Sequence, residues 1–151
     1  MPIMIEPFAL DRYEAVLALW HQCPGVGLSD ADARPNIAAF LARNPGLSFV
    51  ATDGDRVVGA VLCGHDGRRG YLHHMAVHPD FRRQGIGHRL AARCRAALGA
   101  AGIRKCHLFI FSDNGDGQAF WQSAGWSLRQ DIRVMSAPVV APTATDEEPQ
   151  Q

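Results

Sequence analysis

The stretch that most constrains the fold of this chain spans residues 71–101, where a strand, a proline and a glycine-rich loop lead into a helix. Pro79 stops the apolar strand, and Gly85 and Gly87 then precede a segment in which apolar residues recur every fourth position. Two glycines alone require no more than a tight turn. The first turn of a helix, however, presents unpaired backbone N–H groups and the positive end of the helix dipole. The whole pattern therefore predicts an anion-binding loop.

Two other phosphate-binding loops do not fit these residues. A dinucleotide-binding fingerprint requires a third glycine three positions after Gly87, where Leu90 stands. It also requires an acid about 20 residues further on, in a region occupied by His107. A P-loop requires Gly-Lys-Ser/Thr, whereas Gly87 is followed here by His88 and Arg89. Both alternatives are excluded.

Apolar periodicity predicts helices and strands in the order β-α-α-β-β-β-α-β-α-β. The expected strands are 3–6, 47–52, 56–64, 71–77, 104–112 and 126–135, and the expected helices are 10–22, 30–43, 84–101 and 119–124. Because a hairpin turn at residues 53–55 occurs beside strand-to-helix crossovers, this order predicts a single α/β domain with a mixed sheet. We expect the domain to cover residues 1–136. Residues 137–151, with three prolines and an acidic cluster, are expected to form a disordered tail.

Composition argues against several classes of protein. The 151 residues carry 15 basic and 15 acidic side chains, a neutral balance that disfavours binding of nucleic acid by bulk charge. No apolar run reaches the roughly 18 residues of a membrane span, and the first residues lack the basic segment of a signal peptide. No group of side chains has metal-ligand spacing, so we expect no metal. We expect a cytoplasmic protein with reduced thiols at Cys23, Cys63, Cys94 and Cys106.

Two segments resemble the GNAT superfamily of acetyl-CoA-dependent N-acetyltransferases. The run Arg82-Arg83-Gln84-Gly85-Ile86-Gly87 is similar to the family's Arg/Gln-x-x-Gly-x-Gly/Ala motif. Downstream, DNGDGQAFWQSAGW resembles its Asn-(x)6-aromatic-x-x-x-Gly-aromatic segment. The resemblance covers about residues 3–136 and implies a GNAT-like fold, with acetyl-CoA as the acetyl donor.

The resemblance also implies where the donor binds. Backbone amides from Arg83 to His88 would wrap the pyrophosphate, and the strand from Met75 to Val77 would pair with the pantetheine arm. Asn114 would contact an amide of that arm, while Phe120 and Trp121 would line the thioester end. The implied cofactor site is therefore Met75, Ala76, Val77, Arg82, Arg83, Gln84, Gly85, Ile86, Gly87, His88, Asn114, Phe120 and Trp121.

An amine must lose a proton before it attacks a thioester, so the strand before the glycine loop is the place to look for a base. An alkylamine with a pKa of about 10.4 is neutral in roughly one molecule of 10³ at pH 7. The candidates are Tyr71, His73 and His74, and strand alternation places Tyr71 and His73 on one face and His74 on the other, unless a bulge changes the count. Arylalkylamine N-acetyltransferases, which resemble this chain over YLHHMAVH, use a histidine at the position of His73. We expect His73 to be the base and His74 the second choice; the alternative is a histidine that only packs in the sheet.

Trp121 departs from the usual sequence pattern of the family. Many members have a tyrosine where Trp121 stands, and its hydroxyl protonates the leaving thiolate. The indole N–H is no acid, so water or Tyr71 would have to take that role. A thiol with a pKa of about 8.5 is already a fair leaving group.

These observations predict acetyl transfer to a primary amine of a small molecule, peptide or protein, by direct attack in a ternary complex. The alternative is a non-catalytic acyl-CoA binding or sensing module, in which Trp121 marks a lost acid. The acceptor would be selected by residues 20–40, where Asp30 and Asp32 suit a cation but more often complement a helix dipole. We expect no nucleic-acid or membrane partner, and either a monomer or a homodimer, since an exposed final strand can pair with another chain.

Overall fold

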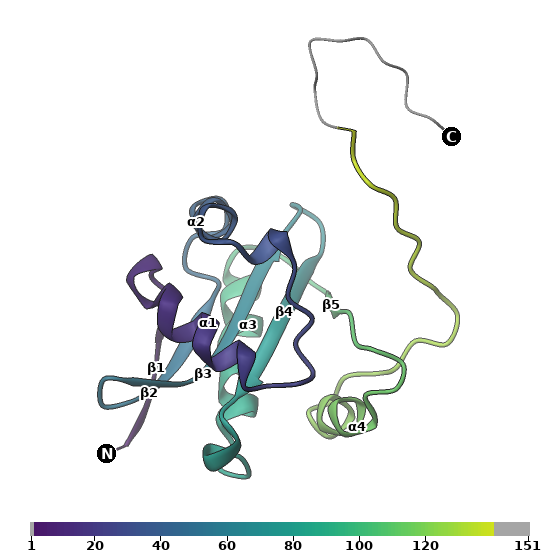
Figure 1. Cartoon of the computed structure of the whole chain (residues 1–151). Helices are drawn as coiled ribbons and strands as arrows, with labels where there is room; N and C mark the ends of the chain where they lie inside the picture. The colour runs from purple at the N-terminus through teal and green to yellow at the C-terminus, as the bar shows by residue number, and fades with distance from the viewer. Residues whose placement is uncertain (1, 141–151) are drawn as a thin grey trace.

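The computed structural model describes residues 2–140, which form a five-stranded mixed sheet with helices on both faces (Figure 1). The strands are β1 (Ile3–Pro7), β2 (Phe49–Asp53), β3 (Arg56–His65), β4 (Gly70–Val77) and β5 (Cys106–Leu108), in the order β1-β2-β3-β4-β5. The first four strands pair antiparallel, and β5 pairs parallel to β4. The α-helices are α1 (Tyr13–His21), α2 (Arg34–Arg43), α3 (Ile86–Ala100) and α4 (Gly115–Ser123). Short 3-10 helices occur as η1 (Leu10–Arg12), η2 (Asp30–Asp32) and η3 (Pro79–Phe81). The α/β class and the mixed sheet are confirmed.

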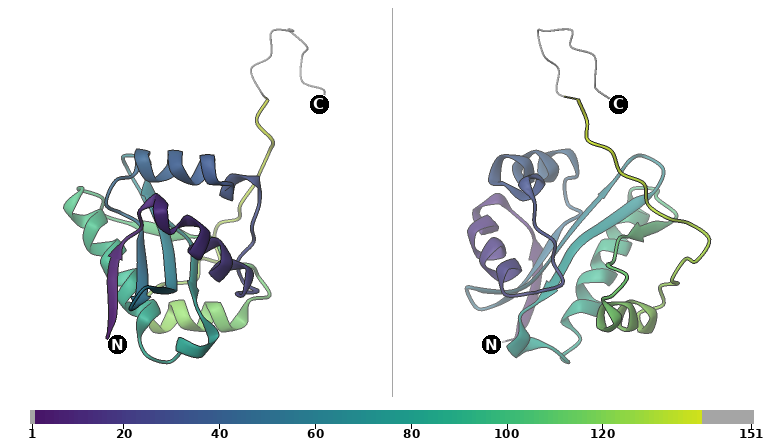
Figure 2. Two further views of the ribbon diagram at one scale, coloured as in Figure 1. Left: turned by 60° about the vertical axis from the view of Figure 1, so that its left-hand side comes forward. Right: turned by 45° about the vertical axis from the view of Figure 1, so that its right-hand side comes forward.

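Two apolar cores lie on opposite faces of the sheet. Helices α1 and α2 cover one face, and α3 and α4 cover the other (Figure 2). Strand β3 serves both cores, because Val58 and Val61 face α3 while Leu62 faces α1 and α2. A strand buried on both sides has no need of alternating polarity, which explains its continuous apolar sequence. Among the described residues, no helix is long and apolar enough to cross a membrane.

A β-bulge interrupts β4 in the middle of the candidate site. Leu62 pairs with His73 and Ala60 pairs with Ala76, so β4 has two residues, His74 and Met75, opposite one residue of β3. His74 takes up the extra length with a φ of 52°, in the left-handed region. Alternation restarts after the bulge, and both His73 and His74 consequently face α1 and α2. Simple alternation, which would separate the two histidines, therefore does not hold, and the bulge that the sequence analysis allowed for is present.

The last two predicted strands differ from the structure. Residues 104–112 were expected to form one strand, but β5 covers only Cys106–Leu108. Residues 126–135 were also expected to form a strand, and none is present there among the described residues. Trp126 packs on the core, whereas Ile132 is 55% exposed and Val134 is 66% exposed. Alternation alone makes no strand without a partner for its backbone.

The expected tail is described only in part. Residues 137–140 are exposed and have no regular structure. Residues 141–151 lie outside the described residues, so the tail there stays a prediction.

Candidate active site

The divergence of β4 and β5 opens a cavity of about 440 Å³. The two strands pair only at Gly70, Tyr71 and Leu72 of β4, and the chain after β5 then turns away while β4 continues to Val77. The cavity is lined by Gly25, Val26, Gly27, Leu72, His73, His74, Met75, Leu108, Phe109, Ile110, Phe111, Asn114, Trp121 and Val134. A parallel pair that separates leaves room for an extended ligand arm between its strands.

The glycine loop opens α3 with left-handed backbone at two places. Gly85 is the N-cap residue of α3 with a φ of 77°, and Arg83 has a φ of 63°. A Cβ added to Gly85 would meet no atom within 4 Å, so the loop is open on that side. The Arg82 Nε donates to the Val77 carbonyl at 3.2 Å and ties the loop to the end of β4. This geometry fits the predicted pyrophosphate cradle, in which backbone amides at a helix start receive an anion.

Gly87 has a different role from the one expected. A Cβ on Gly87 would stand 2.8 Å from the Cζ of Phe120, so this glycine allows α4 to pack against α3. The Phe120 ring also lies 4.8 Å from the His88 ring, between centroids. Phe120 therefore covers the start of α3, and it is not among the residues that line the cavity.

Asn114 and Trp121 both line the cavity between β4 and β5. The Asn114 Oδ1 accepts from the Gly117 N–H at 2.9 Å and caps α4, while its side chain also lines the cavity. Trp121 lines the cavity and packs edge-to-face on Trp126, with ring centroids 5.0 Å apart. The N-terminus of α4 thus fixes both side chains on the cavity wall.

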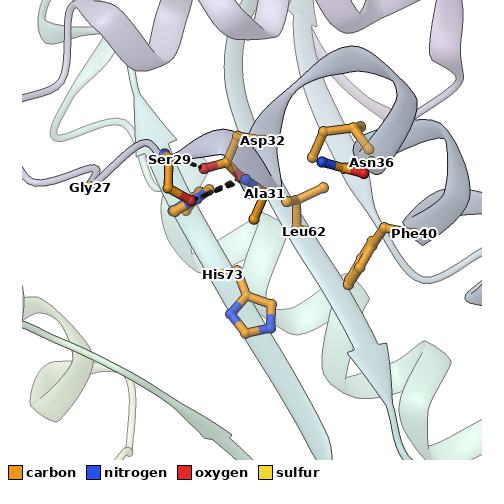
Figure 3. Close-up of a pocket in the computed structure, with 10 residues that line it drawn as sticks. Gly27, Ser29, Ala31, Asp32, Asn36, Phe40, Leu62 and His73 are labelled. Atoms are coloured by element: carbon orange, nitrogen blue, oxygen red, sulfur yellow. Dashed lines mark hydrogen bonds and ion pairs between the residues drawn. The ribbon is translucent and has the colours of Figure 1, made fainter. Parts of the chain in front are cut away.

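A second cavity, of about 350 Å³, lies between β4 and the segment that contains η2 and α2 (Figure 3). It is lined by Gly27, Ser29, Ala31, Asp32, Asn36, Ile37, Phe40, Leu62, His73 and His74. Figure 3 shows Asp32 and Ser29 on one side of this cavity, with His73 rising from β4 toward it. Both histidines line both cavities, so they stand at the junction of the two.

The junction carries a buried acid, Asp32, which the sequence did not connect with the histidines. The Nε2 of His74 lies 2.9 Å from the Oδ1 of Asp32, whose residue is only 7% exposed. The other carboxylate oxygen accepts from the Ser29 N–H at 3.0 Å. Asp32 was expected mainly to complement a helix dipole, and it does close a capping box with Ser29. The Ser-x-x-Asp spacing signals that cap, but nothing in it signals a histidine 42 residues away.

His73 differs from His74 in its surroundings. Burial and the neighbouring His74 lower the pKa of His73, against a smaller raising effect from Asp32. Its ring stacks at 6.4 Å on Tyr71 and meets Phe40 edge-on at 6.1 Å. Tyr71 contacts His73 in this way but lines neither cavity. Thus the structure brings His73 and His74 together at the junction and leaves Tyr71 beside it.

Two further side chains have partners that the sequence did not indicate. Arg89 donates to the Ile3 carbonyl of β1 at 3.0 Å. His78 caps η3 by accepting from the Asp80 N–H at 3.1 Å. Within the described residues, no group of three or more His, Cys, Asp or Glu side chains could hold a metal ion.

Comparison with known proteins agrees with this geometry. The sequence profile of the acetyltransferase (GNAT) family matches residues 13–126. An acetyltransferase of Pectobacterium atrosepticum is 38% identical over 110 residues, which cover 73% of this chain and 77% of that protein.

Solved structures show the same fold at low sequence identity. The PaiA N-acetyltransferase of Thermoplasma acidophilum, in complex with coenzyme A, superposes with a TM-score of 0.75 at 15% identity, over 85% of this chain and 92% of that one. The enzyme AAC(6')-Iy, in complex with the bisubstrate analogue CoA-S-monomethyl-acetylneamine, gives a TM-score of 0.74 at 18% identity, over 92% of this chain and the whole of the other. With the profile match over most of its length, the chain belongs to the GNAT family of acetyltransferases.

Proposed function

We propose that this protein transfers the acetyl group of acetyl-CoA to a primary amine by direct attack in a ternary complex. The observation that carries the proposal is the junction at His73 and His74. One cavity reaches it from the gap between β4 and β5, and the other reaches it from η2 and α2. An amine held in the second cavity would thus meet a thioester held in the first.

The residues present fit an acetyl-CoA molecule. The open backbone at Gly85 suits the pyrophosphate, with amides of residues 83–88 around it. Met75, Ala76 and Val77 would offer the free edge of β4 to the pantetheine arm, since β5 has turned away by that point. Asn114 and Trp121 would line the arm on its other side. The similarity to structures that contain coenzyme A or a bisubstrate analogue supports this assignment.

The chemistry requires the chain to take a proton from the acceptor. Acetyl-CoA supplies an activated acyl group, and a protonated amine then yields an amide, a free thiol and one proton. A histidine at the junction can accept this proton and release it to water. A base in this position contributes about 10²- to 10⁴-fold to the rate.

A covalent acetyl-cysteine step is disfavoured by the thiols. Neither cavity is lined by a cysteine. Burial raises the pKa of the Cys23 and Cys106 thiols, which makes them poorer nucleophiles at neutral pH. The proposal therefore keeps direct attack by the amine.

The acceptor cavity favours a small primary amine over a protein chain. Its volume of about 350 Å³ is at the lower end of the range for small-molecule sites. Ile37, Phe40 and Leu62 supply an apolar wall, and Asp32 and Asn36 supply polar groups. We propose that such an amine is the acceptor and that the reaction takes place in the cytoplasm.

The test is a thiol-release assay with acetyl-CoA and a panel of small amines and short peptides, with product identification by mass spectrometry. We expect an N-acetylated product, and its loss in Gly85→Asp, which puts a negative charge in the phosphate cradle. Gly67→Asp makes the same change in the turn before β4 and should keep activity. Binding of acetyl-CoA without turnover of any amine would contradict the enzyme and favour a sensing module.

A further inference from the structure

The two histidines at the junction are not equivalent. His74 has an acidic partner, with its Nε2 at 2.9 Å from the Asp32 carboxylate. His73 lies among the rings of Phe40, Tyr71 and Phe109. An acid on one ring nitrogen fixes the tautomer of a histidine and stabilises its protonated form. Of the two, only His74 has this support.

The Asp32 side chain is itself held in place. Its Oδ2 accepts from the Ser29 N–H at 3.0 Å, and its backbone carbonyl accepts from the Tyr13 hydroxyl at 2.7 Å. A carboxylate that is 7% exposed and bonded on both oxygens has little freedom to turn away from His74. The 3-10 helix η2 therefore presents Asp32 to β4 in one orientation.

The backbone of His74 is fixed from the other side. The indole Nε1 of Trp20 donates to the His74 carbonyl at 3.1 Å, and the two rings meet edge-on at 5.2 Å. This contact holds the left-handed residue at the bulge, whose strained conformation persists only when its surroundings determine it. Strain of this kind at a cavity junction is typical of a functional residue.

We propose that His74 is the proton acceptor of the reaction and that Asp32 is its positioning residue, an inference that rests on the proposed function. In the resting state the Nε2–H of His74 donates to Asp32. The Nδ1 then takes one proton from the ammonium of the acceptor, directly or through water, and leaves the nitrogen lone pair free for attack. The imidazolium is balanced by the Asp32 carboxylate until it releases the proton to water. Of the two protons left on the amine nitrogen, one is transferred to the leaving thiolate as the C–S bond breaks, and the other stays in the amide.

Few other groups around His74 titrate. Asp32 faces it from η2 and His73 adjoins it on β4, while α1 contributes the uncharged Trp20. Cys23, just beyond α1, donates to the Val77 carbonyl, and burial raises the pKa of its thiol. Leu62 of β3 and Asn36 of α2 line the same cavity without titrating. The low-pH limb of activity should therefore report the Asp32–His74 pair.

The test compares kcat and KM across pH for three variants. His74→Gln should lower kcat by about 10²- to 10⁴-fold and abolish the low-pH limb, with KM for acetyl-CoA nearly unchanged. Asp32→Asn should lower kcat at least about tenfold and move the limb to lower pH, because the anion that favours the charged ring is gone. His73→Gln should keep the limb. The inference is overturned if His73→Gln removes the limb while His74→Gln keeps it.

Asp11→Asn is the matched control, since it makes the same change at an exposed acid in the first turn of another 3-10 helix, η1, which lines neither cavity. It should leave both kcat and the limb as in the wild type. NMR titration of the His74 ring adds a readout that needs no turnover, and its midpoint should fall in Asp32→Asn only. An unchanged midpoint in Asp32→Asn would refute the positioning role even if the enzyme is active. A shifted midpoint without turnover of any amine would instead refute the proposed function.

Discussion

Replacement of Gly85 by alanine separates the strain of the glycine loop from its binding role. Gly85 has a φ of 77° and caps α3, and an added Cβ would meet nothing within 4 Å. The substitution therefore creates no clash. Its cost is the left-handed conformation itself, roughly 1–2 kcal/mol for a residue with a Cβ.

The size of the expected effect follows from this strain. For a chain of 151 residues, each kcal/mol lowers the Tm by about 2–4 °C, so we expect a fall of roughly 2–8 °C. The new methyl group stands on the open side of the loop, where the pyrophosphate would approach the backbone amides. Loss of one hydrogen bond to a charged group costs about 1.5–3 kcal/mol, which raises the Kd for acetyl-CoA about 10- to 150-fold.

The assay pairs thermal unfolding with calorimetric titration, and the chain offers a matched control. Gly67 lies in the turn before β4 with a φ of 89°, and a Cβ there would also meet nothing within 4 Å. Gly67→Ala should therefore lose similar stability and keep the wild-type Kd. If Gly85→Ala loses this stability but binds acetyl-CoA with unchanged affinity, the loop is not the phosphate cradle.

Three further substitutions test other parts of the account. Since burial lowers the pKa of His73, the unfolded chain takes up its proton first as the pH falls through about 6.5, and wild-type stability declines there. His73→Gln should show a smaller loss of unfolding free energy between about pH 7.5 and 5.5 in urea titrations; parallel losses would contradict the shift. Trp121→Phe should keep at least about a tenth of kcat if Trp121 is only a wall of the cavity, and a larger loss would show that the indole N–H takes part. Leu90→Ala, at a fully buried position, should lower the free energy of unfolding by about 2–5 kcal/mol. Leu128→Ala, at a residue that is 44% exposed, should change it by no more than about 0.5 kcal/mol. Equal losses in the two variants would refute the core assignment.

Local sequence signals predicted the parts of the site that local physics determines. Gly85 is left-handed at a helix start because only glycine takes that conformation without cost, and its spacing from Pro79 marks the loop. The N-cap at Asn114 is likewise a signal within one turn of helix. Such features depend on neighbours a few residues away, which a sequence displays directly.

Features that depend on contacts between residues far apart in the chain could not be derived from the sequence. The bulge at His74 exists because β3 and β4 differ by one residue in their register, which only the paired strands reveal. The contact of His74 with Asp32 follows from that bulge and spans 42 residues. Alternation counted along one strand therefore assigned His74 to the wrong face.

The prediction of a final strand was wrong for a related reason. Residues 126–135 have the apolar alternation of a strand, yet they pair with no described strand, and residues 127–135 remain exposed. The contact of Phe120 with Gly87 could not be predicted either, because it depends on how α4 packs on α3. In both cases the pattern identified apolar side chains without identifying what they contact.

The most direct test of the central claim is a calorimetric titration of the purified protein with acetyl-CoA, with ATP and NAD as controls and Gly85→Asp alongside. The account predicts saturable 1:1 binding of acetyl-CoA to the wild type, none of ATP or NAD, and loss of binding in the variant. Absence of acetyl-CoA binding by the folded wild type, or equal binding by Gly85→Asp, would contradict the account.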